Sequence, residues 1–402
     1  MVLKAGLIFA LLLPVLAAGS HAPIVIQGDS DFASCGCVNG GTGSTANPFV
    51  IGPWSINKVA GIGILIDGTS LTRSFVISNI TIAGNGSSSA TGIVLNHINP
   101  NGNASIAARI TGTQTSIQSV GVGILVENSS HVVLDGGGAN GSGAGVGNVA
   151  GTINKNTVGA IDVENSSHIL VTGWQLSANG QDGNPDWVAF DPSLSNWGVG
   201  GVRFLATTSS TIDHNAANNC TSVSFSLFNS SGNAVTNNTA DYPFTANFLV
   251  ADGSSHNTLS GNVAGTADFI GYLVADPLPG TATLVTYGAS HDNVIEANIS
   301  HTDGPTGSEV HSNIAPAFLG GFVVLNGTYN NVIRHNQDWA STGSGFAWAQ
   351  AVPDATPIGV ITYPPALHCN VTASEGGGIA NRNGNTWSGN IFRTIDPCLP
   401  AQ

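Results

Sequence analysis

The largest group of side chains that could bind a ligand lies in the stretch TGWQLSANGQDGNPDWVAFDPSLSNWG, residues 172–198. Indole faces suit sugar rings, and carboxylates suit Ca2+ or sugar hydroxyl groups. We therefore expect a ligand site formed by Trp174, Trp187, Trp197, Asp182, Asp186 and Asp191. The competing interpretation is that this loop packs its indoles against the protein's own wall.

A second loop, HTDGPTGSEVHSN (residues 301–313), combines imidazole and carboxylate groups. Both are common ligands of divalent metals. The candidate ligands are His301, Asp303, Glu309 and His311. A solvated loop without metal is the alternative, and Ca2+ at the first loop is the other cofactor that the sequence suggests.

Three charged residues, Asp213, Glu296 and Arg334, each lie two positions before an asparagine in a recurring short motif. If copies of the motif stack, Glu296 and Arg334 become neighbours. Such a pair is either an exposed ion pair worth ~0–1 kcal/mol or part of a polysaccharide lyase site. Glycoside hydrolysis instead needs two carboxyl groups about 5–10 Å apart. Stacking could supply them by bringing Asp213 near Asp241 or Asp252.

The recurring motif is an apolar residue followed three positions later by asparagine, just after a polar turn. Its copies STIDHN, NAVTNN, NTLSGN, NVIEAN, NVIRHN and NTWSGN end at Asn215, Asn238, Asn262, Asn298, Asn336 and Asn390, and an earlier copy, SFVISN, ends at Asn79. The first two spacings are 23 and 24 residues. Longer spacings fit one period with an insertion, or two periods. A further pair, GILVENSSHVVLDGG and AIDVENSSHILVTGW, begins 37 residues apart.

Apolar and polar residues alternate in short runs such as VRFLA and VSFSLF, and this alternation predicts strands. Strands that return every ~23 residues without helical segments indicate a solenoid whose turns stack with parallel strands. An antiparallel sandwich is the alternative, but the tight two-residue turns that it needs do not recur. We expect stacked asparagines to bond to the backbone and to each other, and NSSH to form the same corner in two turns.

Several stretches resemble a known family. The N-terminal IQGDSDFASCGCVNGGTGSTANPFVIGPWSI and GIGILIDGTSLTRSFVISNITIAG are similar to the opening of NosD-like right-handed parallel β-helix proteins, and SSHNTLSGN, YNNVIRHN and NGNTWSGN resemble the family's repeats. The resemblance is weakest near 100–120, 139–157 and 342–375. It implies an all-β fold, a single-stranded right-handed parallel β-helix of the pectate-lyase-like superfamily. That group includes lyases, hydrolases, phage tailspikes and non-enzymatic surface proteins.

For NosD itself, the resemblance implies periplasmic help in supplying copper to nitrous-oxide reductase. Cu(I) sites favour Cys and Met sulfur, but the only methionine is Met1. The eleven histidines are scattered, although four share similar corner positions: His131, His168, His256 and His291. The Gly-His-Gly of polygalacturonases and the Arg-x-Pro-x-x-Arg of lyases are missing. Copper delivery therefore ranks behind carbohydrate functions.

The composition bears on partners and on export. Lys and Arg total 9 against 23 Asp and Glu, giving a net charge of −14, and 8% of residues are charged. A surface so poor in cations cannot neutralise many phosphates, so nucleic acid is not an expected partner. The basic start, the apolar run over 5–18 and the small residues up to Ala22 are typical of a secretory signal peptide. No later stretch is long enough to predict a membrane span.

An exported chain with five cysteines is expected to carry disulfides. We expect a Cys369–Cys398 bond, while Cys35, Cys37 and Cys220 leave one odd thiol; the CGC could alternatively bind a metal. Sequons are dense, and we expect several to be occupied where the organism glycosylates exported chains. They are Asn79, Asn85, Asn103, Asn128, Asn140, Asn165, Asn219, Asn229, Asn237, Asn298, Asn326 and Asn370.

These features predict a signal peptide over 1–22, a cap over 23–60, a parallel β-helix over 61–341 and a disulfide-closed tail over 342–402. We expect insertions near 100–120, 139–157, 181–198 and 300–318. The expected function is that of a secreted or cell-surface glycoprotein (periplasmic in a Gram-negative source) binding polysaccharide through its lateral face and Trp-bearing loops. The alternatives are a polysaccharide lyase or glycoside hydrolase, and a structural surface or filament protein that self-assembles.

Overall fold

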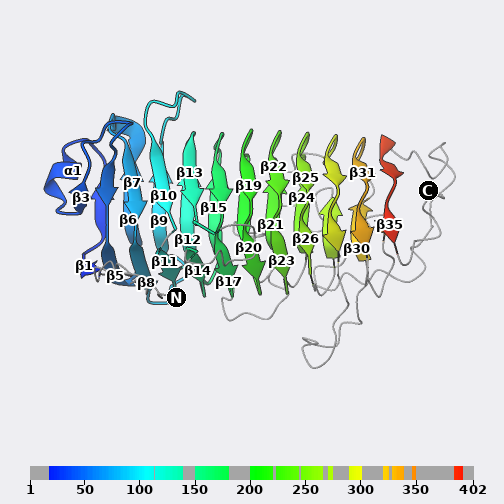
Figure 1. Ribbon diagram of the computed structural model, residues 1–402, viewed down its shortest axis with the longest axis horizontal. Coiled ribbons are helices and arrows are strands. Elements are labelled where there is room, and N and C mark those ends of the chain that lie inside the picture. The colour runs from blue at the N-terminus through cyan, green and yellow to red at the C-terminus, as the bar shows by residue number, and fades with distance from the viewer. Residues whose placement is uncertain are drawn as a thin grey trace, which may run out of the picture.

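The structure is a computed structural model, and nearly all of its regular structure is β, arranged in three sheets (Figure 1). The residues that it describes are 18–112, 114–138, 150–180, 200–220, 223–243, 246–265, 270–274, 289–300, 320–325, 328–338, 346–349 and 384–392. No helix in these ranges is long and apolar enough to cross a membrane.

Two of the sheets are named A and B here. Sheet A has 12 strands: β1 (Gly19–Ser20), β5 (Trp54–Val59), β8 (Ile80–Gly84), β11 (Ser116–Gln118), β14 (Thr152–Asn154), β17 (Gln175–Ser177), β20 (Ala216–Asn218), β23 (Thr239–Asp241), β26 (Val263–Ala264), β29 (Ile299–Ser300), β32 (Gln337–Asp338) and β35 (Ile391–Phe392). Sheet B has 11: β2 (Ile24–Ile26), β6 (Ile62–Asp67), β9 (Thr91–Asn96), β12 (Val122–Glu127), β15 (Gly159–Glu164), β18 (Val202–Leu205), β21 (Val223–Phe228), β24 (Ala246–Ala251), β27 (Ile270–Val274), β30 (Gly320–Leu325) and β33 (Phe346–Ala349).

The third sheet is named C. Its 12 strands are β3 (Val38–Gly40), β4 (Phe49–Ile51), β7 (Phe75–Ser78), β10 (Ala108–Thr111), β13 (Val132–Asp135), β16 (Leu170–Thr172), β19 (Thr211–Asp213), β22 (Ala234–Thr236), β25 (Thr258–Ser260), β28 (Val294–Glu296), β31 (Val332–Arg334) and β34 (Thr386–Ser388). The described helical segments are short: α1 (Asp31–Ser34) and the 3-10 turn η1 (Gly68–Ser70).

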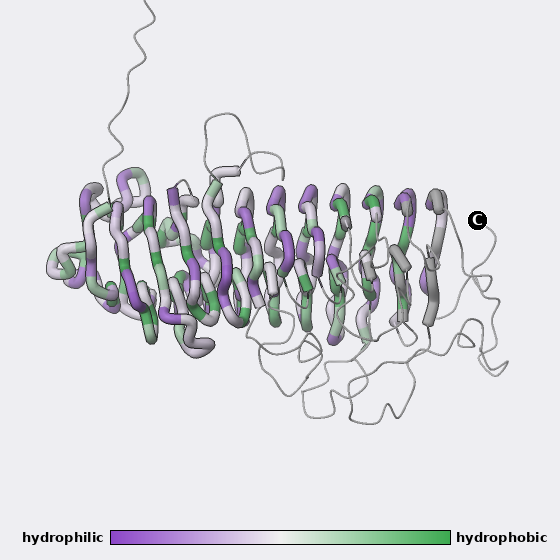
Figure 2. Tube along the Cα trace, turned by 90° about the horizontal axis from the view of Figure 1, so that it is seen from below, coloured by the Kyte–Doolittle hydropathy of each residue, from purple (hydrophilic) through white to green (hydrophobic). Residues whose placement is uncertain are grey.

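The chain visits the three sheets in rotation. Strands β5, β6 and β7 belong to sheets A, B and C, and β8 returns to sheet A beside β5. One such passage is called a coil below. Neighbouring strands are parallel throughout, apart from the β3–β4 pair near the N-terminus. Coils therefore stack along one long axis (Figures 1 and 2), as in a parallel β-helix, and the hairpin sandwich does not describe this part of the chain.

The core lies between the sheets and is built from inward residues in register. In sheet B, one row consists of Ile66, Leu95, Val126, Val163 and Phe204, which pair from strand to strand and are all fully buried. Burial of each such side chain contributes about 1.5–3 kcal/mol, so repetition along the axis compensates for the small area of each coil.

Aromatic rings continue the core toward the C-terminus. Phe225, Phe248, Tyr272 and Phe322 stack on successive coils, with ring centroids 5.2, 4.7 and 4.6 Å apart. The Tyr272 hydroxyl donates to the Asn262 carbonyl oxygen at 2.8 Å, which satisfies the one polar atom of this column.

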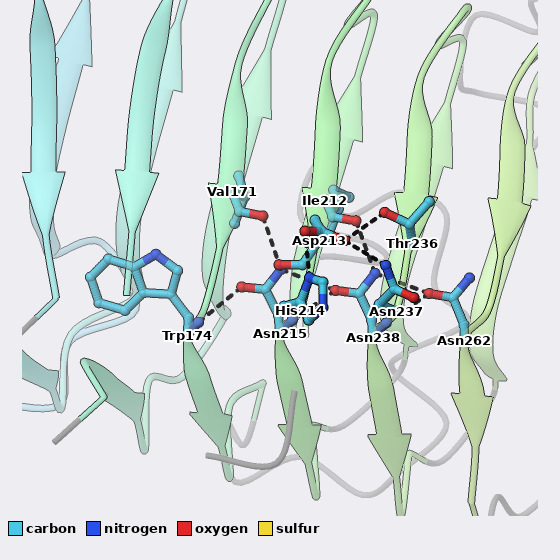
Figure 3. A network of polar contacts seen from close by, with 10 residues as sticks. All are labelled: Val171, Trp174, Ile212, Asp213, His214, Asn215, Thr236, Asn237, Asn238 and Asn262. Atoms are coloured by element: carbon cyan, nitrogen blue, oxygen red, sulfur yellow. Dashed lines mark hydrogen bonds and ion pairs between the residues drawn. The ribbon is translucent and has the colours of Figure 1, made fainter. Parts of the chain in front are cut away.

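The predicted asparagine ladder is confirmed (Figure 3). Asn215 and Asn238 are fully buried, and the Nδ2 of Asn215 donates to the Val171 carbonyl at 3.0 Å and to the Oδ1 of Asn238 at 3.1 Å. The same pattern links Asn238 to Asn262 and continues through Asn298, Asn336 and Asn390. A second ladder at the other end of sheet C, which the sequence did not predict, consists of Asn233, Asn257, Asn293, Asn331 and Asn385.

The assignment of Asn79 to the first ladder is wrong by one residue. Strand register through β7, β10, β13, β16 and β19 aligns Asn79 with His214, while the buried Ile80 occupies the position of Asn215. Asn79 and His214 both have left-handed backbone angles, with φ of 53°. Asparagine is enriched in that conformation as well as in the ladder, so the motif alone could not separate the two positions.

The interpretation of NSSH as a repeated corner is confirmed. Ser130 and Ser167 form a parallel bridge, and the strands before them, β12 and β15, are direct neighbours. The backbone N–H of Ser129 donates to the Oγ of Ser166 at 3.1 Å, so the serines link the two coils.

Two other expectations are revised. Residues 108–111 and 116–118, inside the expected insertion near 100–120, form β10 and β11 in normal register; the interruption is therefore shorter and precedes β10. Cys35 and Cys37 form a disulfide, so the CGC has no thiolate for a metal, and Cys220 is the buried odd thiol. Cys369 and Cys398 lie outside the described residues.

Candidate functional site

Four charged side chains gather on the outer face of sheet B. Glu127 ends β12, Asp162 and Glu164 belong to β15, and Arg203 belongs to β18. Alternation along β15 sends Asp162 and Glu164 outward, because Val163 between them points into the core. Register pairs Glu127 with Glu164 and Asp162 with Arg203, so the four residues cover three neighbouring coils.

Arg203 joins two of these carboxylates. Its Nε lies 2.9 Å from Asp162 Oδ1, and its Nη2 lies 2.7 Å from Asp162 Oδ2 and 2.6 Å from Glu164 Oε1. The guanidinium thus binds Asp162 with both arms of its fork, a strong and directional contact. Glu164 is held at its edge by the same Nη2.

Burial divides the cluster into a buried ion pair and two more exposed glutamates. Arg203 and Asp162 are each 4% exposed, whereas the Glu164 side chain keeps 24% of its surface and Glu127 is half-buried. Buried charges are stable only when they are paired, which the Arg203–Asp162 fork provides. The two glutamates are therefore the groups that a ligand can reach.

Burial raises the pKa of both glutamates above its ordinary value. Burial, followed by repulsion from Asp162, raises the pKa of Glu164 to about 7, although Arg203 opposes the rise. Burial and Asp162 also raise the pKa of Glu127, while His97 opposes that rise. A carboxyl group that still carries a proton near neutral pH, beside a second carboxyl group, is the arrangement required for acid–base catalysis.

A different polar network lies on sheet C (Figure 3). Asp213 accepts hydrogen bonds from Thr236 Oγ1 at 2.6 Å and Asn237 Nδ2 at 3.1 Å, and its Oδ2 lies 2.5 Å from His214 Nδ1. Burial acts to raise the pKa of Asp213, but these hydrogen bonds outweigh it and lower the pKa. Asp213 is therefore held as a carboxylate and fits the role of an anchor for His214 better than that of an acid.

The predicted stacking of Glu296 on Arg334 is confirmed. The Nε of Arg334 lies 2.7 Å from Glu296 Oε2, in directly paired positions of β28 and β31. Both side chains are substantially exposed. Of the two interpretations, an exposed ion pair and a lyase site, the geometry fits the exposed ion pair, because the arginine is already bound to a carboxylate.

The proposed pairing of Asp213 with Asp241 or Asp252 is wrong. Asp213 ends β19 in sheet C, Asp241 ends β23 in sheet A, and Asp252 follows β24 of sheet B. The three carboxylates thus belong to different sides of the coil.

Trp174 does not belong to a surface site. It is 1% exposed, its Nε1 donates to the Leu134 carbonyl at 3.0 Å, and its backbone N–H donates to Asn215 Oδ1 at 3.0 Å. Trp174 therefore starts the asparagine ladder from inside the core (Figure 3). Its expected partners Trp187, Trp197, Asp182, Asp186 and Asp191 lie outside the described residues.

The metal candidates His301, Asp303, Glu309 and His311 also lie outside those residues. Within the described ranges, no group of three or more His, Cys, Asp or Glu side chains could hold a metal ion. The histidines at the corner after sheet B form ring contacts instead: His131 stacks on His168 with centroids 4.6 Å apart, and His291 stacks on Tyr329 at the same distance.

The sequons fall into three groups. Asn298 is fully buried in the ladder, and its Nδ2 donates to Asn336 and to the Leu259 carbonyl, so a glycan there is incompatible with the fold. The accessible ones are Asn79, Asn85, Asn103, Asn128, Asn165, Asn219, Asn229 and Asn237. Those outside the described residues are Asn140, Asn326 and Asn370.

Sequence reasoning missed the cluster around Glu164, although a signal was present. The two VENSSH copies already place Glu127 and Glu164 at the same position of neighbouring coils. Extending that alignment to the next strand, VRFL, places Arg203 beside Asp162.

Comparison with models of known protein families gives no match, and no curated protein is significantly similar to the chain. The fold and the cluster define a class: an all-β protein of stacked parallel coils with an acid–arginine cluster on one outer face.

Proposed function

We propose that the protein is a right-handed parallel β-helix that binds polysaccharide on the outer face of sheet B and hydrolyses glycosidic bonds there. The supporting observation is the direct pairing of Glu127 with Glu164 on neighbouring strands, beside the buried Asp162–Arg203 pair. Neighbouring strands are about 5 Å apart, which is close to the carboxyl separation of retaining glycosidases.

In the proposed reaction, the Glu164 carboxyl group gives its proton to the glycosidic oxygen as the carbon–oxygen bond breaks. The Glu127 carboxylate attacks the anomeric carbon and forms a glycosyl ester, and the leaving chain departs as an alcohol. Water then attacks the ester, gives one proton to Glu164 and releases Glu127 and the sugar hemiacetal. Asp162 and Arg203 act as positioning residues, because they hold Glu164 in place and set its charge.

Hydrolysis explains the cluster better than lyase chemistry does. A lyase needs an accessible Arg or Lys base, but Arg203 is 4% exposed and bound to two carboxylates, and Arg334 is bound to Glu296. Two carboxyl groups on neighbouring strands, such as the paired Glu127 and Glu164, are what retaining hydrolysis uses.

The other expected properties belong to the same proposal. Right-handedness is supported by the strong preference of parallel crossover connections for that hand. The cap, export, NosD-like ancestry and N-glycosylation rest on the sequence patterns alone. Binding through the loop of Trp187 and Trp197 and metal binding at His301–His311 likewise stay predictions.

The test is a reducing-end assay of the purified protein on a panel of polysaccharides, with absorbance of unsaturated uronates followed in parallel. We expect reducing ends from at least one glycan and no unsaturated product. Glu164→Gln and Glu127→Gln should each lower the rate at least 100-fold, whereas Glu296→Gln, on sheet C, should leave it unchanged. Full activity of both cluster variants, or no cleavage of any glycan, contradicts the proposal.

A further inference from the structure

Two parallel rows of outward side chains lead along sheet B to the glutamate pair. The apolar row consists of Val25, Leu65, Val94 and Leu125, which pair in register from β2 to β12. The acidic row, two residues further along each strand, consists of Asp67, Asn96, Glu127 and Glu164. Because outward residues alternate along a strand, both rows share one face.

The apolar row offers a surface that a sugar chain can cover. Val25 is 51% exposed and Leu65 and Leu125 are half-buried, whereas Val94 is 5% exposed and adds little accessible surface. Four strands spaced by ~4.8 Å make the acidic row about 14 Å long, enough for a short stretch of glycan. Ligand sites of this kind combine an apolar floor with a few polar groups that fix orientation.

The acidic row has an excess of negative charge. Burial acts to raise the pKa of Asp67, but hydrogen bonds from Thr69 outweigh it and lower the pKa, so Asp67 is a carboxylate at working pH. Its ion-pair partner is the His97 imidazole, 3.6 Å away. Across the part of the chain that the structure describes, Glu127 has no ion pair. Arg203, which follows Leu125 and Asp162 in register, is held by Asp162 and Glu164.

From this geometry we infer that the two rows bind a polysaccharide whose sugar units carry free amino groups. The inference depends on the proposed hydrolytic function and names its substrate class. Sugar C–H faces cover Leu65 and Leu125, while ammonium groups meet Asp67 and Glu127, where a cation relieves the repulsion between carboxylates. Uronic acid chains are disfavoured, since their carboxylates would face Asp67 and Glu127, and the nearby described cation, Arg203, already binds Asp162 and Glu164.

Binding is measured by calorimetry on the Glu164→Gln variant, which avoids turnover during titration. The probes are a β-1,4-linked glucosamine hexasaccharide, its fully N-acetylated counterpart and a galacturonic acid hexasaccharide. We expect the free-amine chain to bind at least 10-fold more tightly than the acetylated one, and the galacturonate not to bind. Raising the salt concentration from about 0.05 to about 0.5 M should weaken only the binding of the free-amine chain, since salt screens charge contacts.

Variants separate the two rows. Asp67→Asn keeps an acceptor for the Thr69 N–H but removes the charge, so it should reduce the amine preference at least 5-fold without affecting the acetylated probe. Leu65→Ser should weaken both probes alike, and Glu296→Gln should change neither. Circular dichroism confirms that each variant is folded.

The outcomes distinguish the substrate class from the hydrolytic function. Equal or tighter binding of the acetylated or galacturonate probe overturns the substrate class, and cleavage of a neutral glycan by the wild type would then still support hydrolysis. Selective amine binding without cleavage of any glycan supports the substrate class and contradicts the hydrolytic function.

Discussion

Asn215 donates two hydrogen bonds to one atom of Asn238: its backbone N and its Nδ2 lie 2.9 and 3.1 Å from Asn238 Oδ1. Asn238 in turn donates through Nδ2 to the Ile212 carbonyl at 2.9 Å and to Asn262 Oδ1 at 3.0 Å. Every polar atom of the buried amide is therefore used, and each coil is linked to both neighbours.

Replacing Asn238 by alanine should destabilise the fold by about 2–4 kcal/mol, because it leaves buried partners on both neighbouring coils unsatisfied. Urea unfolding followed by circular dichroism measures the change. The control is Asn237→Gly, the adjacent exposed residue with φ of 54°, a conformation that glycine adopts readily. Equal stability of the two variants would show that the ladder contributes little.

The buried pair Arg203–Asp162 gives a second stability prediction. Arg203→Met leaves the Asp162 charge buried without its fork and should cost about 3–5 kcal/mol. Adding Asp162→Leu removes that charge, so the double variant should recover most of the loss. Thermal and urea unfolding of the two single variants and the double variant measure the coupling. An additive double variant would contradict the direct interaction.

The same double variant separates stability from activity. Without Asp162 and Arg203, Glu164 loses the repulsion that raises its pKa and the contact that positions it, so the recovered fold should not recover glycan cleavage. A double variant as active as the wild type would show that the pair is purely structural.

The sequence predicted those features that depend only on the repeat period. The ladder positions Asn215 to Asn390 and the Glu296–Arg334 pair follow once coils are aligned, because strand register converts equal positions into neighbours. Trp174 was misplaced because it stands next to an unusual Asp- and Trp-rich stretch, whereas strand register gives it a ladder position in the core. Composition cannot show which side of a corner a residue faces.

The cluster around Glu164 was harder to predict. Arg203 follows Asp162 by 41 residues, well above one period, so the repeat period alone does not align them, and the alignment needs the VENSSH copies extended to VRFL. Arg203 and Asp162 are also buried although they point outward, which is unusual for charged side chains. That burial arises only when the coils are assembled. The acidity of Glu164 depends on that burial first and on Asp162 second.

Glycan occupancy supplies a further prediction. When the protein is expressed in a host that glycosylates exported chains, peptide mass spectrometry should find glycans at the exposed corner sequons Asn128 or Asn165 and none at Asn298 in folded protein. The reason is that Asn298 uses its Nδ2 for two buried hydrogen bonds. A folded, secreted species glycosylated at Asn298 would contradict the assignment of this residue to the ladder.

The last prediction concerns pH. The pKa of Glu164 is raised to about 7 in the fold, above its ordinary value of 4.5, so the folded state binds more protons than the unfolded state between those values. The contribution of Glu164 to the unfolding free energy is therefore favourable at low pH and is lost as pH rises from about 4.5 to about 7. Glu164→Gln should flatten that fall in unfolding free energy.

Activity should follow the same proton. The rate of glycan cleavage should decline above pH about 7 as Glu164 loses the proton that it donates. Asp162→Asn removes the repulsive charge and should move this limb to lower pH, provided that circular dichroism shows the variant folded. Glu296→Gln, which lies on sheet C and not on sheet B, should leave both the pH profile of stability and the pH profile of the rate unchanged. A limb that stays near pH 7 in Asp162→Asn would mean that another group supplies the proton.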